Sequence, residues 1–453
     1  MLFLSDADGE EGLWYHEDMW GGQVDAIIKS ISFVGSMIGM CVMGYLGDRI
    51  GRNPAFALTS LLMVIFSLAS GLIYAPGTSA KDNNVAMGLL LVCRFFLGVG
   101  IGGCYPLAST KGAEECGSTH AIDKNQAVGV IYFWQAVGDL FPYISGMVLA
   151  LLPMGDPLRF RFALSVGLFP PLAVLYMTYG SGESRQHCAS SRRSYLEQVR
   201  AGFKEHDAIP NFLTTAVCWM LYDVSYYGSN QFTPRMTEKV FGDGVTVFTK
   251  CWHGAVDMLV GLPATWHSIW LLRYWGTKRV QLSGFASIAV SSVIVAVVWT
   301  PLTSDDASEG SAYILFAIYL LFYYAVNWGA KMGAFVLPQE VYKPEIRATF
   351  TGLAAAAGKF GAIVGIWLFE AVTPIIGLVP VMLFVAALST VGALLSHFYI
   401  SDGLWDSQKA QMAEQQRSQS TPYDALTLER DAHSSHNPSI QSNPLQYGGD
   451  SEN

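Results

Sequence analysis

Long apolar runs separated by short polar breaks dominate this chain. Runs such as 285–300, 313–326 and 379–400 reach, with their flanks, the length of about 20 apolar residues that a membrane-spanning helix needs. The pattern predicts an all-α membrane protein with about eleven spanning helices. Their expected positions are near 24–46, 54–76, 87–109, 125–151, 160–180, 210–231, 251–273, 279–301, 312–336, 349–372 and 379–400.

The polar segments divide the spans into two groups. We expect an acidic extracytoplasmic leader at 1–23, an N-terminal helix bundle at 24–180, a cytoplasmic central loop at 181–209, a six-helix C-terminal bundle at 210–400 and a disordered cytoplasmic tail at 401–453. Within the central loop, the stretch 195–203 has an amphipathic pattern. A solvated linker is the favoured interpretation there, with a short helix as the alternative.

Composition supports the membrane assignment. The chain of 453 residues is 51% hydrophobic and only 14% charged, whereas soluble domains carry about 25% charged residues. These values exclude a soluble enzyme and a nucleic-acid-binding protein. Lys and Arg favour cytoplasmic loops. Placing the 48–52 loop inside puts fourteen basic residues in inside loops and six in outside loops, so the tail is expected in the cytosol.

This topology places residues 1–23 outside, although they do not resemble a signal peptide. A helix missing upstream is the favoured explanation, and unaided translocation of a short leader is the alternative. Two short loops of glycine and basic residues, 47–52 and 274–279, follow the first and seventh spans. With one further helix each half would hold six, a duplicated design common among transporters.

The first of these loops belongs to a longer motif. The motif consists of Gly44-Tyr-Leu-Gly-Asp48-Arg49-Ile-Gly51-Arg52. Glycines allow a tight turn, and the acid and arginines can pair with each other and with neighbouring helix ends. The motif resembles the conformational loop motif of the major facilitator superfamily, which implies two helix bundles with twelve helices.

A narrower resemblance covers four spans. The segments 94–114, 219–227 and 329–363 are similar to parts of the fourth, seventh, tenth and eleventh helices of the phosphate:proton symporter family. The resemblance implies secondary transport of inorganic phosphate or a related oxyanion by alternating access, with proton coupling left open, and a plasma-membrane location. It also implies that the first helix of the family is absent from this chain.

Ionisable residues within spans are costly and usually functional. Trp219, Asp223 and Tyr227 share one helix face because they are spaced i, i+4 and i+8. Lys359 lies deep in a span, between Gly358 and Gly361, where another helix can approach closely. The other ionisable candidates in spans are Arg94, Asp139, Asp257 and Lys331.

The resemblance assigns roles to matching positions. It implies that phosphate is bound by Tyr105, Gln135, Trp219, Tyr227 and Lys359, with Asp223 beside the anion as the proton-coupling acid. This chain departs from the family in having Cys104 where the family has an acid and Lys331 where it has an asparagine, so Lys331 joins the expected substrate-binding residues. A thiol does not readily replace a carboxylate as proton carrier. The more positive cavity favours a strong anion such as phosphate dianion, sulfate or an organophosphate.

Other functions stay open. One alternative is a sugar or organic-anion carrier of the same superfamily, and another is a non-transporting nutrient sensor or inactive paralogue. An enzyme is not expected because no nucleophile–base or metal-type constellation occurs in the sequence. We therefore expect no cofactor and no metal, and the partners are the lipid bilayer, the anion and, as an option, the proton.

Overall fold

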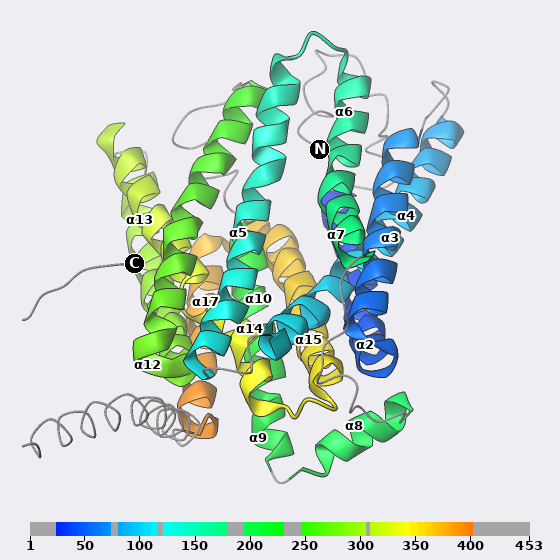
Figure 1. The fold of residues 1–453 in the computed structure, drawn as a ribbon. Helices are drawn as coiled ribbons and strands as arrows, with labels where there is room; N and C mark the ends of the chain where they lie inside the picture. Colours follow the sequence, from blue (N-terminus) through cyan, green and yellow to red (C-terminus); the bar gives the residue numbers. More distant parts are fainter. Residues whose placement is uncertain are drawn as a thin grey trace, which may run out of the picture. The chain divides into compact units, whose positions relative to one another are not determined.

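The structure, a computed structural model, describes residues 24–73, 80–115, 121–179, 194–205, 207–230, 246–304 and 309–401. Every regular element in these ranges is a helix (Figure 1). The predicted acidic leader and almost all of the predicted tail lie outside the described residues.

The helices before the central loop are α2 (Val24–Ile50), α3 (Arg52–Leu72), α4 (Ala80–Glu115), α5 (Ala121–Leu151) and α6 (Asp156–Ser165), which continues through η2 (Val166–Leu168) into α7 (Phe169–Tyr179). Their ends lie within four residues of the predicted spans, except that α4 extends seven residues before and six residues beyond the predicted span 87–109.

The helices after the central loop are more often interrupted. They are α9 (Ala208–Phe212), η4 (Leu213–Val217), α10 (Cys218–Asn230), α12 (Val247–Thr303), α13 (Glu309–Asn327), α14 (Ala330–Val341), α15 (Arg347–Trp367), η5 (Leu368–Val372), α16 (Thr373–Ile376) and α17 (Leu378–Tyr399).

Nine stretches of the described residues are long and apolar enough to cross a membrane. One of them, α12, has 57 residues, a length of about 85 Å at 1.5 Å per residue, against a hydrocarbon thickness of about 30 Å. It is interrupted at Gly276, whose φ of 72° lies in the left-handed region, and its two halves therefore make two crossings. The continuous helical stretch 208–230 coincides with the predicted span 210–231.

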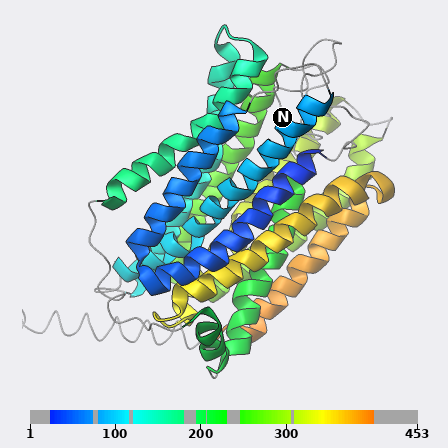
Figure 2. The same cartoon turned by 90° about the vertical axis from the view of Figure 1, so that its right-hand side faces the viewer.

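Close contacts between helices rest on small residues. α2 packs along α4 and along α15, and α5 packs along the first half of α12 (Figures 1 and 2). A methyl group added to Gly39 would overlap the carbonyl oxygen of Val99, and one added to Gly352 would overlap that of Met40. Glycine thus lets the backbones approach each other, as is usual where membrane helices pack.

The predicted span 312–336 is in fact broken. α13 ends at Asn327 and α14 begins at Ala330, with Gly329 between them at φ 62°. The Gly329 N–H donates to Ser268 Oγ at 2.8 Å, and its backbone presses directly against Gly284. The break therefore follows from a tertiary contact between α13–α14 and α12.

The prediction of a solvated linker at 195–203 is wrong. This stretch forms α8 (Tyr195–Phe203), which begins with a reciprocal capping box between Ser194 and Glu197. The ring of Phe203 packs against Phe212 and Phe350, with centroids 5.3 and 5.5 Å away. α8 therefore contacts α9 and α15 through Phe203 and through Gly202, which lies against Phe350.

Candidate anion-binding site

A buried ammonium group lies at the middle of the helices. Lys359 is 3% exposed and lies twelve residues into the span Arg347–Ile376, about 18 Å from its start. Its Nζ donates to Tyr227 Oη at 2.7 Å and to Asp223 Oδ2 at 3.3 Å. The predicted neighbours on α10 therefore meet the predicted lysine on α15.

The close approach of α10 and α15 positions this contact. A methyl group added to Gly361 would overlap the Met220 carbonyl oxygen, and one added to Gly358 would meet the Trp219 indole. Aromatic rings surround the ammonium, with its Nζ 4.4 Å from the Tyr227 centroid, 5.2 Å from that of Tyr105 and 5.4 Å from that of Phe33. Such rings attract a cation.

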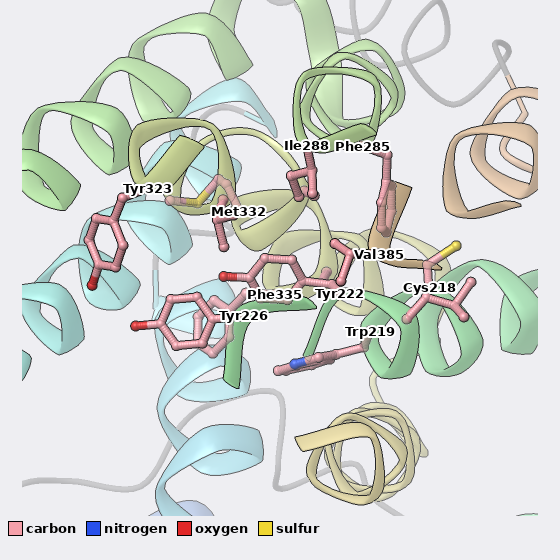
Figure 3. Close-up of a cluster of buried hydrophobic side chains, with 14 of the residues drawn as sticks. Cys218, Trp219, Tyr222, Tyr226, Phe285, Ile288, Tyr323, Met332, Phe335 and Val385 are labelled. Atoms are coloured by element: carbon pink, nitrogen blue, oxygen red, sulfur yellow. The ribbon is translucent and has the colours of Figure 1, made fainter. Parts of the chain in front are cut away.

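Tyr105 and Gln135 complete the first cluster. The Gln135 amide donates to Tyr105 Oη at 2.8 Å, which joins α5 to α4. The Tyr105 ring lies 6.3 Å from Trp219 and 6.5 Å from Phe335, centroid to centroid. Figure 3 shows Trp219 beside Phe335 in the aromatic cluster that α10 and α14 form. Six of the seven predicted binding residues therefore belong to one connected group.

The seventh, Lys331, forms a second cationic position. It is 2% exposed, donates to Asn327 Oδ1 at 3.0 Å and lies 5.0 Å from the Tyr226 centroid and 5.6 Å from that of Tyr132. Tyr226 in turn packs edge-on against Tyr227 at 5.1 Å. The two lysines are thus linked through adjacent tyrosines of α10.

Four further residues of this site were not predicted from the sequence: Asn327, Tyr132, Tyr226 and Phe33. Asn327 carries a local signal, because it precedes Lys331 by four residues on the predicted helix and therefore shares its face. The other three are aromatic residues in aromatic-rich spans, and only the tertiary structure distinguishes them from packing residues.

The two ammonium groups of this site have unequal partners. Lys359 has a carboxylate partner at 3.3 Å, whereas Lys331 has none within 4.0 Å in the part of the chain that the structure describes. The buried Tyr222 hydroxyl has no hydrogen-bond partner among the same residues. Two ammonium groups, one direct carboxylate partner and several neutral donors suit a small anion with several oxygen acceptors.

The loop motif forms a second network at the α2–α3 junction, which we name the loop end of the helices. Arg52 donates to Asp48 at 2.9 Å and to Glu114 of α4 at 2.7 and 3.2 Å. Asp48 Oδ2 accepts from the backbone N–H and hydroxyl of Thr349 at 2.8 and 2.6 Å. Gly51 has φ 113° and provides the turn. Gly44 lies directly against α15.

Arg49 differs from the rest of the motif. Its side chain is exposed and donates to Tyr45 Oη at 3.1 Å in the preceding turn. The loop motif gives no reason to distinguish Arg49 from Arg52, but only Arg52 belongs to the buried network.

Further hydrogen bonds join the two halves at the loop end. Gln339 donates to Ser109 at 3.0 Å, and Lys124 donates to the Gln339 carbonyl oxygen at 2.6 Å. Glu340 accepts from Asn125 and from Thr277. The helices before and after the central loop are therefore held together here, so the loop end is closed in this structure.

The fold and the buried cationic site define a membrane transporter of the major facilitator class. The chain belongs to the sugar (and other) transporter family, whose model matches residues 21–201 and 189–402. Its fold resembles a proton:xylose symporter, with a TM-score of 0.69, 15% identity and coverage of 88% of this chain and 89% of the other. It also resembles the human organic anion transporter MFSD10, with a TM-score of 0.62, 15% identity and coverage of 82% and 83%.

Two phosphate transporters have a higher sequence identity to this chain than these solved structures have. The inorganic phosphate transporter PT2 of Toxoplasma gondii is 34% identical over 373 residues, and the match covers 82% of this chain and 64% of that relative. The low affinity inorganic phosphate transporter 4 of Lotus japonicus is 26% identical over 405 residues, with 76% and 73% coverage. The chain thus spans just under two thirds of the Toxoplasma relative.

Proposed function

We propose that this protein carries inorganic phosphate across a membrane by alternating access. The observation that carries the proposal is the Lys359 ammonium, buried at the middle of the spans and paired with Asp223 and Tyr227. The names of the relatives supply the substrate: phosphate offers several oxygen acceptors to this lysine and to Tyr105, Gln135 and Trp219. Coupling to protons is part of the proposal.

Phosphate binding would rearrange the ion pair. The anion competes with Asp223 for Lys359, and a carboxylate beside an anion is stabilised by taking up a proton. Phosphate and a proton would then bind together at Asp223 and neutralise the site before the halves move. The closed loop end supports such a cycle, since Asp48–Thr349 and Gln339–Ser109 must separate for the cavity to open there.

The test is uptake of radiolabelled phosphate in cells that lack their own phosphate carriers. Lys359→Met should lower uptake at least about tenfold, because a charge-assisted hydrogen bond contributes about 1.5–3 kcal/mol. The matched control is Lys343→Met, since that lysine is 64% exposed and pairs with Glu205 at the surface; its uptake should equal wild type.

Folding must be separated from binding, because removing one partner of a buried pair costs about 3–5 kcal/mol. The double variant Lys359→Met with Asp223→Asn removes both charges and should restore the amount of folded protein but not uptake. Wild-type uptake in the double variant would remove the site assignment. Absence of phosphate uptake by well-expressed wild type, with uptake of a sugar, would favour the sugar-carrier alternative instead.

We also propose the plasma membrane as the site of action. Labelling of intact cells with a membrane-impermeant amine reagent, followed by recovery of labelled protein, tests this location. Recovery only after the cells are opened would assign the protein to an internal membrane.

A further inference from the structure

A buried acid on α12 has no part in the site described above. Asp257 is 1% exposed, and neither oxygen of its carboxyl group has a hydrogen-bond partner among the described residues. A charged carboxylate removed from water needs a cation or several donors to offset the lost hydration. Without them, the neutral, protonated form is the stable one in this conformation.

The surroundings of Asp257 come from three elements and hold no fixed positive charge. The Tyr143 ring of α5 covers Gly254, three residues before Asp257. Tyr323 of α13 donates to Met258 Sδ at 3.4 Å, beside Asp257 in the chain. The titratable groups facing this part of α12 are His253 and Cys251 of α12 itself, Tyr143 and Asp139 of α5, Tyr323 of α13, and Tyr226 of α10, which lies near Tyr323 (Figure 3).

Two other buried acids, Asp223 and Asp139, differ from Asp257 because lysines lie near them. Asp223 has Lys359 at 3.3 Å, and Asp139 lies within electrostatic reach of both Lys331 and Lys359. No lysine or arginine of the described residues makes an ion pair with Asp257 or acts on it appreciably. Lysines therefore lie close enough to Asp223 and Asp139 to offset part of a negative charge there, whereas no lysine or arginine of the described residues does so for Asp257.

Asp257 is also connected to the binding site. One helical turn further along α12, Gly261 packs directly against the Asn327 side chain, and Asn327 accepts the hydrogen bond from Lys331. This contact lies next to the break between α13 and α14. Broken helices at the middle of a membrane are typical of sites where transporters hold a substrate or a coupling ion.

We propose that Asp257 is a proton-carrying site that drives transport, separate from the substrate-binding residues. A proton from the water on one side joins a carboxylate oxygen, stays there while the halves are closed, and leaves to the water on the other side; no other bond changes. A metal cation would need several oxygen ligands, and the described residues hold no His, Cys, Asp or Glu cluster of that kind. The inference rests on the proposed phosphate transport.

The first experiment measures phosphate accumulation in proteoliposomes with the membrane potential clamped. One coupled proton permits up to about tenfold more accumulation per pH unit of gradient, since a pH unit corresponds to 1.36 kcal/mol. Asp257→Asn, which mimics the protonated acid, should lower accumulation about tenfold per pH unit relative to wild type. Phosphate exchange at equal pH should be unchanged. Glu205→Gln is the control, since this acid is 43% exposed and pairs with Lys343 at the surface; it should accumulate phosphate like wild type.

A second measurement uses the wild-type protein and needs no variant. An apolar carbodiimide reacts with protonated, buried carboxyl groups, so it should label Asp257, and labelling should decline as the pH rises. Mass spectrometry of the peptides locates the label. Asp223, paired with Lys359, should label far less.

The outcomes separate the two proposals. If the wild-type protein exchanges phosphate and Asp257→Asn accumulates phosphate as well as wild type does, the proton site is overturned and phosphate transport stands. The same holds if Asp257 of the wild-type protein is not labelled at low pH. The proton site would also be overturned if a sodium gradient drives phosphate accumulation and Asp257→Asn abolishes that accumulation. Wild type that neither exchanges nor accumulates phosphate would overturn the proposed function, and this inference with it.

Discussion

Two buried lysines with different partners determine the chemistry of the site. Lys359 is balanced by Asp223 and bonded to Tyr227, whereas Lys331 is held by the neutral amide of Asn327 and by aromatic faces. Removing an ammonium group from water is costly without a charged partner. Asp139 lies within electrostatic reach of Lys331 but does not form an ion pair with it, so a bound anion with more than one negative charge would supply a direct partner.

The first prediction concerns this second lysine. Lys331→Asn should weaken inhibition of phosphate uptake by sulfate about tenfold, because sulfate keeps both negative charges near neutral pH and loses one charge-assisted interaction. Competition curves measured with labelled phosphate at fixed pH give the inhibition constant of sulfate for the wild-type protein and for the variant. Equal sulfate inhibition in wild type and variant would show that Lys331 does not face the bound anion.

At the scale of the element, the interruptions of the helices are as informative as the helices. Gly51, Gly276 and Gly329 all have positive φ, a conformation that costs other residues energy. The first two are the turns between consecutive spans in the two halves, and the third is a break inside a span. Sequence analysis located the first two through their Gly-plus-basic loops and missed the third, since an isolated glycine in an apolar run does not by itself indicate a break.

The second prediction tests the break. Gly329→Ala should lower the free energy of unfolding by about 1–3 kcal/mol, because alanine at this φ is strained and its methyl group would press against the backbone of Gly284. Thermal unfolding in detergent measures the effect. Gly88→Ala in α4 is the control, since a methyl group there would meet nothing within 4 Å, and it should unfold at the wild-type temperature or slightly above.

At the scale of the whole membrane domain, the loop end is joined across the two halves. Asp48 and Arg52 connect α2, α3 and α4 with α15, while Glu340 connects α14 with α5 and with the second half of α12. In each network a glutamate near the end of a helix accepts a hydrogen bond from a residue that directly follows a glycine turn. The pairs are Glu114 with Arg52 and Glu340 with Thr277. Opening of this end must break both.

The third prediction concerns this closure. Asp48→Ala removes the acceptor for Thr349, so it should lower phosphate uptake several-fold and speed labelling of a cysteine introduced at Ser109, which is buried at the loop end. Rates of reaction with a polar maleimide, corrected for the native cysteines, measure access. Arg49→Ala alters the same loop outside the buried network and should change neither quantity; a similar response of both variants would contradict the assignment.

The sequence by itself determined the all-helical membrane fold, the places of most spanning helices and most members of the residue group that surrounds Lys359. These follow from hydrophobic length and from residue types that are costly in a bilayer, such as Lys359 and Asp223. Only the tertiary structure decided that Asp223 pairs with Lys359, that Arg52 and not Arg49 is buried, and that α13 breaks before α14. Each of these depends on contacts between residues far apart in the chain, and helical periodicity carries no information about them.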